Sequence, residues 1–123
     1  MKLEVGQFAR LKSGYICKII NINDFREPNM KYGVEANYLR DIMFIGDNDI
    51  AKASYNIIDI LEVGDYVNGN KVIEIEKNYK FIDGTIRDIL WTDTKMQKAI
   101  WDETIKSIVT KEQFEQMAYK VGD

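Results

Sequence analysis

The chain has 123 residues, of which 46% are hydrophobic and 30% are charged, and its formal net charge is −3. This composition is typical of a folded globular protein with one domain, or with two very small lobes sharing a core. No apolar run approaches the roughly 20 residues of a membrane span, and the N-terminus has no basic-then-apolar signal segment, so we expect a cytoplasmic protein.

The residue types that are missing exclude several kinds of chemistry. Histidine is absent, which removes His-based general base catalysis, Ser-His and Cys-His relays and the usual zinc or iron ligand sets. Cys17 is the only cysteine, and its apolar neighbours predict a buried side chain rather than a reactive thiol. The acidic turn 47–49 lacks the further ligands of an EF-hand loop. We therefore expect no enzyme, no metal and no cofactor.

The first half of the chain predicts short antiparallel strands. Residues 2–11 read as a strand interrupted by Gly6, and after the turn 12–14 a β-branched strand over 15–22 completes a first hairpin. Pro28 lies in a polar loop. Further strands are expected at 32–38, 41–45 and 50–54, followed by a tight apolar connection at 56–61.

The second half begins with the strongest short hairpin signal in the chain. Asn68-Gly69 accepts the positive φ angles of a type I′ turn, and Asp83-Gly84 signals a second turn before a strand at 86–91. Residues 93–103 fit either a helical turn or a strand end. A strand is expected at 105–109 and another at 119–121. Between them, Thr110 and Gln113 form a predicted capping box that starts a helix from 111 to about 118, with Val109 and Phe114 as its apolar staple.

Two short patterns recur in the same order along the chain. Residues 5–9 and 63–67 both read valine, glycine, polar, aromatic, small apolar, and residues 39–44 match 86–91 as apolar, Arg, Asp, Ile, apolar, aromatic. We interpret this recurrence as an internal duplication, with the extra residues of the first copy placed in the Pro28 loop. The predicted fold is mainly β: tandem SH3-like antiparallel units of small β-barrel type, 1–61 and 62–123, packed as one compact domain with one short C-terminal helix.

Two groups of residues are candidates for binding. Arg40 and Arg87 occupy matching positions in the second pattern, so each either forms a local ion pair with the following Asp or contributes to a pair of guanidinium forks. With Trp91 for stacking, such forks suit a phosphate, a nucleotide or a partner carboxylate. Arg10, Lys12 and Tyr15 on the first hairpin suit a partner protein or a nucleic-acid edge, or they form a solvated hairpin.

Several strings resemble a group of small proteins carried by phages and prophages of low-GC Gram-positive bacteria. They are residues 4–8 with the turn 12–14, and residues 53–69, 105–115 and 119–121. The resemblance implies a β-rich phage accessory protein that works in the cytoplasm of the host bacterial cell. Proteins of this kind often act against host defence, as anti-CRISPR proteins do, by binding a defence protein or sequestering its signal molecule.

These observations together predict a non-enzymatic interaction protein that binds and inhibits or modulates a host protein. Two alternatives stay open: a small-ligand binder that sequesters a nucleotide signal, and an SH3-like nucleic-acid-binding module. The net charge of −3 gives no broad electrostatic attraction to nucleic acid, which makes a protein or a small nucleotide the expected partner.

Overall fold

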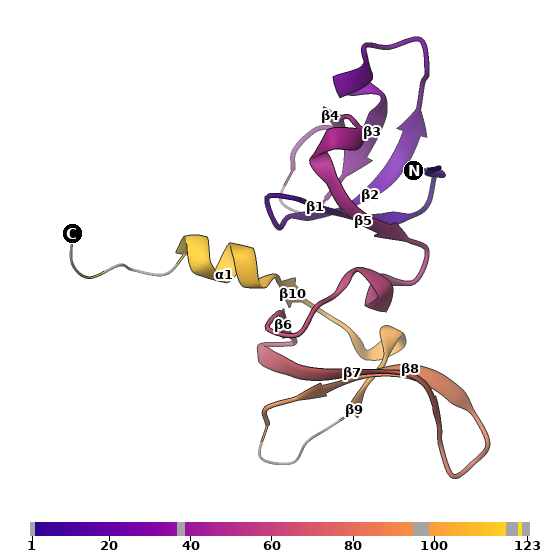
Figure 1. Cartoon of the computed structure of the whole chain (residues 1–123), viewed down its shortest axis with the longest axis vertical. Helices are drawn as coiled ribbons and strands as arrows, with labels where there is room; N and C mark the ends of the chain where they lie inside the picture. Colours follow the sequence, from indigo (N-terminus) through magenta and orange to yellow (C-terminus); the bar gives the residue numbers. More distant parts are fainter. Residues whose placement is uncertain (1, 37–38, 95–98, 118–120, 122–123) are drawn as a thin grey trace. The chain divides into compact units, whose positions relative to one another are not determined.

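The computed structural model describes residues 2–36, 39–94, 99–117 and 121. Within them the fold is mainly β, with two antiparallel five-stranded sheets and one short C-terminal α-helix (Figure 1). The chain divides into two compact units, Met1–Ile60 and Leu61–Asp123, which we call unit 1 and unit 2.

Unit 1 contains a single antiparallel sheet with the strand order β4-β3-β2-β1-β5. Its strands are β1 (Phe8–Leu11), β2 (Ile16–Ile22), β3 (Tyr32–Glu35), β4 (Met43–Ile45) and β5 (Ile50–Ser54). Three short 3-10 helices accompany them: η1 (Pro28–Met30), η2 (Asp47–Asp49) and η3 (Ile57–Ile60).

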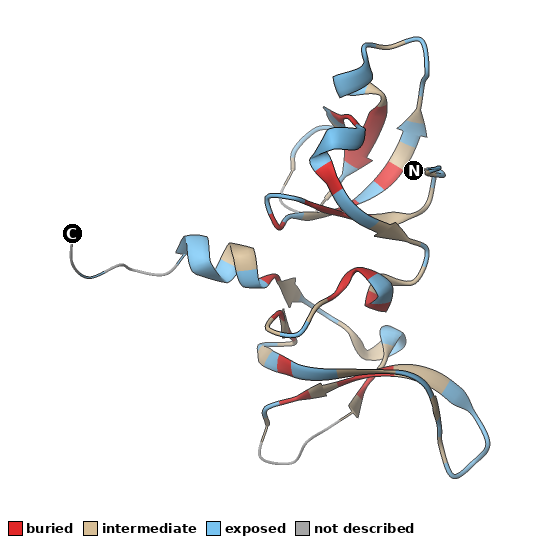
Figure 2. Ribbon diagram, in the orientation of Figure 1, coloured by how far each residue is buried: buried red, intermediate tan, exposed pale blue. Residues whose placement is uncertain are grey.

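The core of unit 1 follows from the period-two alternation of its strands. In β2, for example, Cys17 and Ile19 are buried while Lys18 between them is exposed. Figure 2 shows these buried positions as red bands along the strands. The buried cluster draws on all five strands and consists of Ala9, Leu11, Cys17, Ile19, Tyr32, Val34, Ile45 and Ile50.

Unit 2 contains the second sheet, with the order β10-β6-β7-β8-β9. Its strands are β6 (Tyr66–Val67), β7 (Asn70–Lys80), β8 (Ile86–Thr92), β9 (Ala99–Ile100) and β10 (Ile108–Val109). The 3-10 helix η4 (Asp102–Thr104) precedes β10, and the α-helix α1 (Lys111–Met117) follows it. Strands β7 and β8 form a long hairpin that extends beyond their shorter neighbours (Figure 1).

The two sheets have the same strand path. In each, four consecutive strands form a meander and the fifth pairs with the first on its other side. A register shift falls at the same place in the second strand, between Ile19 and Asn21 in β2 and between Val72 and Glu74 in β7. Among the described strands the two edges of each sheet do not pair with each other, so neither sheet closes into a barrel.

The turn that precedes the first strand is also the same in both units. Gly6 and Gly64 have positive φ angles of 98° and 101°. The Gly6 N–H donates to Ile19 O at 2.7 Å, and the Gly64 N–H donates to Val72 O at 2.9 Å. The first recurring pattern of the sequence, around Val5 and Val63, therefore marks one backbone conformation that occurs twice.

The second recurring pattern does not mark a common position. The string at 39–44 leads into β4, the fourth strand of unit 1, whereas the string at 86–91 lies in β8, the third strand of unit 2. The prediction that Arg40 and Arg87 are related by the repeat is therefore wrong. The inference that the excess residues of the first copy lie in the Pro28 loop depended on the same match, so it loses that support.

Most of the predicted elements are present, although most strands are shorter than expected. Strand β5 has the predicted bounds, whereas the strands predicted at 2–11 and 32–38 reduce to Phe8–Leu11 and Tyr32–Glu35. The expected strand at 105–109 reduces to Ile108–Val109, and the connection at 56–61 contains η3. Part of the ambiguous stretch, residues 95–98, and most of the predicted last strand, residues 119–120, lie outside the described residues.

The capping box at the start of α1 is confirmed. The Gln113 N–H donates to Thr110 Oγ1 at 3.2 Å, and the Thr110 N–H donates to Gln113 Oε1 at 2.9 Å. Phe114 in the first turn of the helix stacks on Tyr66 of β6, with ring centroids 4.6 Å apart. The helix is thus held to its own sheet by an aromatic contact, although none of its residues is buried.

Candidate functional site

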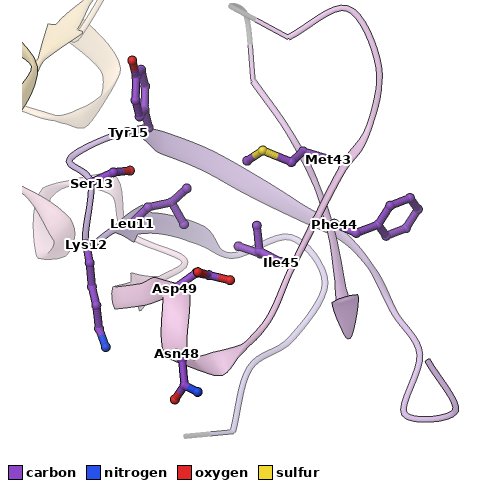
Figure 3. Close-up of a pocket in the computed structure, with 9 residues that line it drawn as sticks. All are labelled: Leu11, Lys12, Ser13, Tyr15, Met43, Phe44, Ile45, Asn48 and Asp49. Atoms are coloured by element: carbon purple, nitrogen blue, oxygen red, sulfur yellow. The ribbon is translucent and has the colours of Figure 1, made fainter. Parts of the chain in front are cut away.

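A pocket of about 470 Å³ lies in unit 1, between the β1–β2 turn on one side and β4 with η2 on the other (Figure 3). Its lining mixes apolar, aromatic and polar side chains, which is the usual composition of a binding site. The lining residues are Leu11, Lys12, Ser13, Tyr15, Met43, Phe44, Ile45, Asn48 and Asp49.

The wall formed by the β1–β2 turn depends on the length of that turn. Residues 12–15 connect the two strands, and the turn is closed by hydrogen bonds from Leu11 N to Tyr15 O and from Gly14 N to Leu11 O, both 2.8 Å long. Gly14 has a φ of 96°, a conformation that residues with a side chain rarely adopt. The Lys12 N–H donates to Asp49 O at 2.9 Å, which fixes the turn against η2.

The corresponding turn of unit 2 has only the residues Asn68 and Gly69, with φ angles of 53° and 82°. The Asn68 side-chain amide donates to Thr104 O at 2.9 Å, so a side chain binds the 3-10 helix where unit 1 uses the turn backbone. With this shorter turn, unit 2 lacks the segment that carries Lys12 and Tyr15 in unit 1. The pocket wall is thus a feature that distinguishes the two units.

The floor and sides of the pocket are apolar. Leu11 and Ile45 are 7% and 5% exposed and belong to the core of unit 1. Tyr15 keeps 37% of its surface exposed, and Met43 is half-buried. Phe44 is 40% exposed, but in Figure 3 its ring points away from Tyr15 and Leu11. A ligand that covers Tyr15 and Met43 would remove apolar surface from water, which is the main favourable contribution to association.

One end of the pocket is polar. In Figure 3 the side chains of Lys12 and Asn48 both point to the end opposite Tyr15. Among the described residues neither side chain has a hydrogen-bond or ion-pair partner. Asp49 is already engaged, because its Oδ2 accepts the Gly46 N–H at 3.0 Å. Lys12 and Asn48 therefore present N–H donors that a ligand can satisfy.

The neighbouring acid of η2 is also engaged within unit 1. The Tyr32 hydroxyl donates to Asp47 Oδ1 at 2.6 Å. Burial, and then the hydrogen bond to Asp47, raise the pKa of Tyr32 above its ordinary value of 10.0. This contact joins η2 to the core strand β3 and holds the 3-10 helix in place beside the pocket.

The loop between β2 and β3 supports Phe44 from outside the pocket. Arg26 donates to the backbone oxygens of Met30 and Lys31 at 2.9 and 3.0 Å, and to Asn21 Oδ1 at 2.6 Å. Its guanidinium carbon lies 4.7 Å from the centroid of the Phe44 ring, a cation–π contact. Arg26 thus orders the loop and packs on the Phe44 ring, which points away from the pocket in Figure 3.

The structure separates the three candidates of the first hairpin. Lys12 and Tyr15 line the pocket, but Arg10 is only 1% exposed, and its Nη1 donates to Ile60 O at 3.1 Å. The expectation that Arg10 contacts a partner is wrong, because its side chain is buried and joins β1 to η3.

Of the other three candidates, Arg87 and Trp91 lie in one aromatic cluster of unit 2. Tyr79 makes edge contacts with Trp91 and with Phe81, at centroid distances of 6.1 and 5.1 Å. Phe81 contacts Trp101 at 5.9 Å, and the Arg87 guanidinium lies 5.5 Å from the Trp101 ring and 3.6 Å from a carboxylate oxygen of Glu103. Arg40 is exposed in unit 1 and is not part of this cluster.

The remaining reactive or metal-binding options give no site in the described residues. Within them no group of three His, Cys, Asp or Glu side chains is placed to hold a metal ion. Cys17 is buried, its thiol lies 3.8 Å from Ala9 O, and burial raises its pKa to about 11. No helix in the described part of the chain has the length and apolar character needed to cross a membrane.

Sequence reasoning missed the half of the pocket that β4 and η2 supply. Met43, Phe44 and Ile45 read as an ordinary apolar strand, and Asn48 reads as a turn residue. The sequence signal for this half was the turn after the first strand, which is longer at residues 12–15 than the matching turn Asn68-Gly69. A longer turn between matching strands has to pack against another part of the chain.

The fold and the site define a mainly β protein of two open antiparallel sheets, with a pocket in the first unit. A comparison with known protein families, curated proteins and solved structures finds no match for this chain.

Proposed function

We propose that the chain is a non-enzymatic binding module, which takes an extended segment of a partner protein in the pocket of unit 1. The observation that supports this function most is the composition of the pocket. An apolar floor, the half-exposed ring of Tyr15 and unpaired polar donors at one end suit recognition of a peptide segment.

The repeated strand path supports a specialised role for unit 1. We interpret the two sheets as tandem SH3-like units that arose by duplication, because the order of strands, the register shift in the second strand and the glycine turn recur. The longer turn 12–15 is then the feature that gives one copy a pocket. Unit 2 instead has the longer second hairpin, with strands of 11 and 7 residues against 7 and 4 in unit 1.

We further propose that the partner is a host protein and that its binding inhibits or modulates that protein. The resemblance to phage and prophage accessory proteins supports this assignment, with a host defence protein as the target of an anti-CRISPR-like role. Contacts of this kind need no catalytic group, which fits a chain without histidine.

A peptide selection tests the binding function directly. A random heptapeptide display library would be selected against the full chain, and the recovered peptides retested on Tyr15→Ala and on Phe25→Ala. Phe25 is fully exposed and does not line the pocket, so it is the matched aromatic control. We expect Tyr15→Ala to weaken binding about tenfold or more, as truncation of an aromatic contact residue does, with Phe25→Ala unchanged. Peptides that bind both variants as well as the original chain would contradict the proposal.

The second candidate function is capture of a nucleotide by unit 2. The observation that favours it is that Arg87 and Trp91 lie in one half-exposed aromatic cluster, where a base could stack and a phosphate could meet the guanidinium. A thermal-shift screen with cyclic nucleotides and NAD-derived compounds tests it, with Arg87→Met as the variant that should abolish any shift. Unchanged melting temperatures across the panel would reject it. Binding of single-stranded nucleic acid that disappears in modest salt would support the third alternative instead.

A further inference from the structure

The polar end of the unit 1 pocket narrows the class of segment that it can take. Lys12 Nζ has three N–H donors and no acceptor capacity, and the Asn48 amide adds two donors and an acceptor. Both side chains point to the same end of the pocket (Figure 3), and neither has a partner among the described residues. This end of the pocket therefore suits a ligand group that accepts hydrogen bonds.

The two acidic side chains beside this end are not the acceptors that pair with Lys12. Asp49 directs Oδ2 to the Gly46 N–H, 3.0 Å away, and Asp47 accepts the Tyr32 hydroxyl. Neither carboxylate lies within ion-pair distance of Lys12 in the described chain. The backbone of Lys12 is fixed beside the pocket, because the Lys12 N–H bonds to Asp49 O at 2.9 Å.

The other end of the pocket favours an apolar ligand group. Leu11 and Ile45 form an apolar floor, and Tyr15 supplies a half-exposed ring above it. Desolvating these surfaces favours a large aliphatic or aromatic side chain. The pocket is thus apolar toward Tyr15 and rich in donors toward Lys12.

We propose that the pocket binds a peptide segment in which a large apolar side chain is followed or preceded, within a few residues, by a carboxylate that Lys12 and Asn48 receive. This inference rests on the peptide binding proposed above. We assign this carboxylate to the side chain of an Asp or Glu in the segment. A C-terminal carboxylate has the same chemistry at Lys12, and it is the alternative that the experiment distinguishes.

Fluorescence polarisation with designed peptides tests the inference. The probes are labelled, amidated peptides with one Phe or Leu and one Asp, separated by zero to three Gly. Each has a twin with Asn in place of Asp, and a further arm has no Asp but a free C-terminus. We expect Asp peptides of the best spacing to bind about three- to tenfold more tightly than their Asn twins, the range of a partly exposed ion pair. The free-carboxylate arm shows which source of the charge is preferred.

Variants separate this inference from the proposed function. Lys12→Met should remove the preference for Asp over Asn, whereas Lys18→Met, on the same hairpin but outside the pocket, should leave it intact. Tyr15→Ala should weaken Asp and Asn peptides equally. If Asp peptides bind no more tightly than their Asn twins, or if the preference for Asp survives Lys12→Met, the proposed carboxylate recognition is wrong, while peptide binding in the pocket stands. Peptide binding that is indifferent to Tyr15→Ala overturns the proposed function itself, and absence of binding by every peptide overturns both.

Discussion

Gln7 and Asp65 occupy the same place in the two units. The Glu4 N–H donates to Gln7 Oε1 at 2.8 Å, and the Glu62 N–H donates to Asp65 Oδ2 at 2.7 Å. One side-chain oxygen thus closes the glycine turn in each unit. Asp65 does more, because its second oxygen accepts the Lys111 N–H at 2.9 Å, at the start of α1.

Truncating these two side chains should therefore have unequal effects. Asp65 is fully buried and satisfies two backbone donors, so we expect Asp65→Ala to lower the free energy of unfolding by about 2–4 kcal/mol. Gln7→Ala loses one bond at a half-exposed site and should cost about 0.5–1 kcal/mol. Urea denaturation measures both. Asp65→Asn, which keeps one acceptor oxygen, should fall between them, and equal losses for Gln7→Ala and Asp65→Ala would contradict this account.

The glycine turns give a second prediction about stability. A Cβ at Gly64 would meet nothing closer than Lys111 Cδ at 3.5 Å, so the cost of Gly64→Ala is conformational, about 1–2 kcal/mol at its φ of 101°. At Gly6 the new Cβ would also lie 3.3 Å from the Tyr55 ring, so Gly6→Ala should cost at least as much. Denaturation curves in which either variant matches the original protein would show that these angles are not required.

Arg26 links the β2–β3 loop to β4, and its replacement should loosen that loop. Arg26→Lys keeps the charge but cannot reproduce three fork-like hydrogen bonds together with the contact to Phe44. We expect faster amide hydrogen exchange over residues 23–31. Unchanged exchange in this loop would mean that Arg26 does not order it.

Cys17 predicts how stability depends on pH in the alkaline range. Burial raises the pKa of its thiol from 9.0 to about 11. The folded chain therefore holds this proton more tightly than the unfolded chain, so the contribution to stability is complete below about pH 9 and is lost as the pH rises through about 11. The free energy of unfolding should fall less steeply with pH in Cys17→Ala than in the original protein between these values. Identical slopes would contradict burial of the thiol.

Local signals in the sequence were sufficient for the elements of both units but not for the way distant segments meet. The Asn68-Gly69 turn and the Thr110 capping box were predictable because each depends on residues close together in the chain. The match between 39–44 and 86–91 failed because a short apolar pattern fits any half-buried strand, and it fell on the fourth strand in one unit and the third in the other.

The candidate site was predictable only in part, for the same physical reason. Lys12 and Tyr15 could be singled out as neighbours on one turn. That they line one pocket with Met43 and Asn48 depends on the tertiary arrangement of β4 and η2 around the turn, which residues close together in the sequence do not encode. Arg10 was misassigned because alternation along β1 does not reveal that its side chain is buried and that its guanidinium reaches the Ile60 carbonyl.

The most direct test of the central claim is a nitrogen-15 NMR titration of the full chain with the tightest peptide from the display selection. If the pocket of unit 1 is the binding site, the largest amide shifts will fall on residues 11–15, 43–45 and 48–49. Shifts concentrated on the aromatic cluster around Tyr79, Trp91 and Trp101, with the pocket residues unmoved, would contradict it.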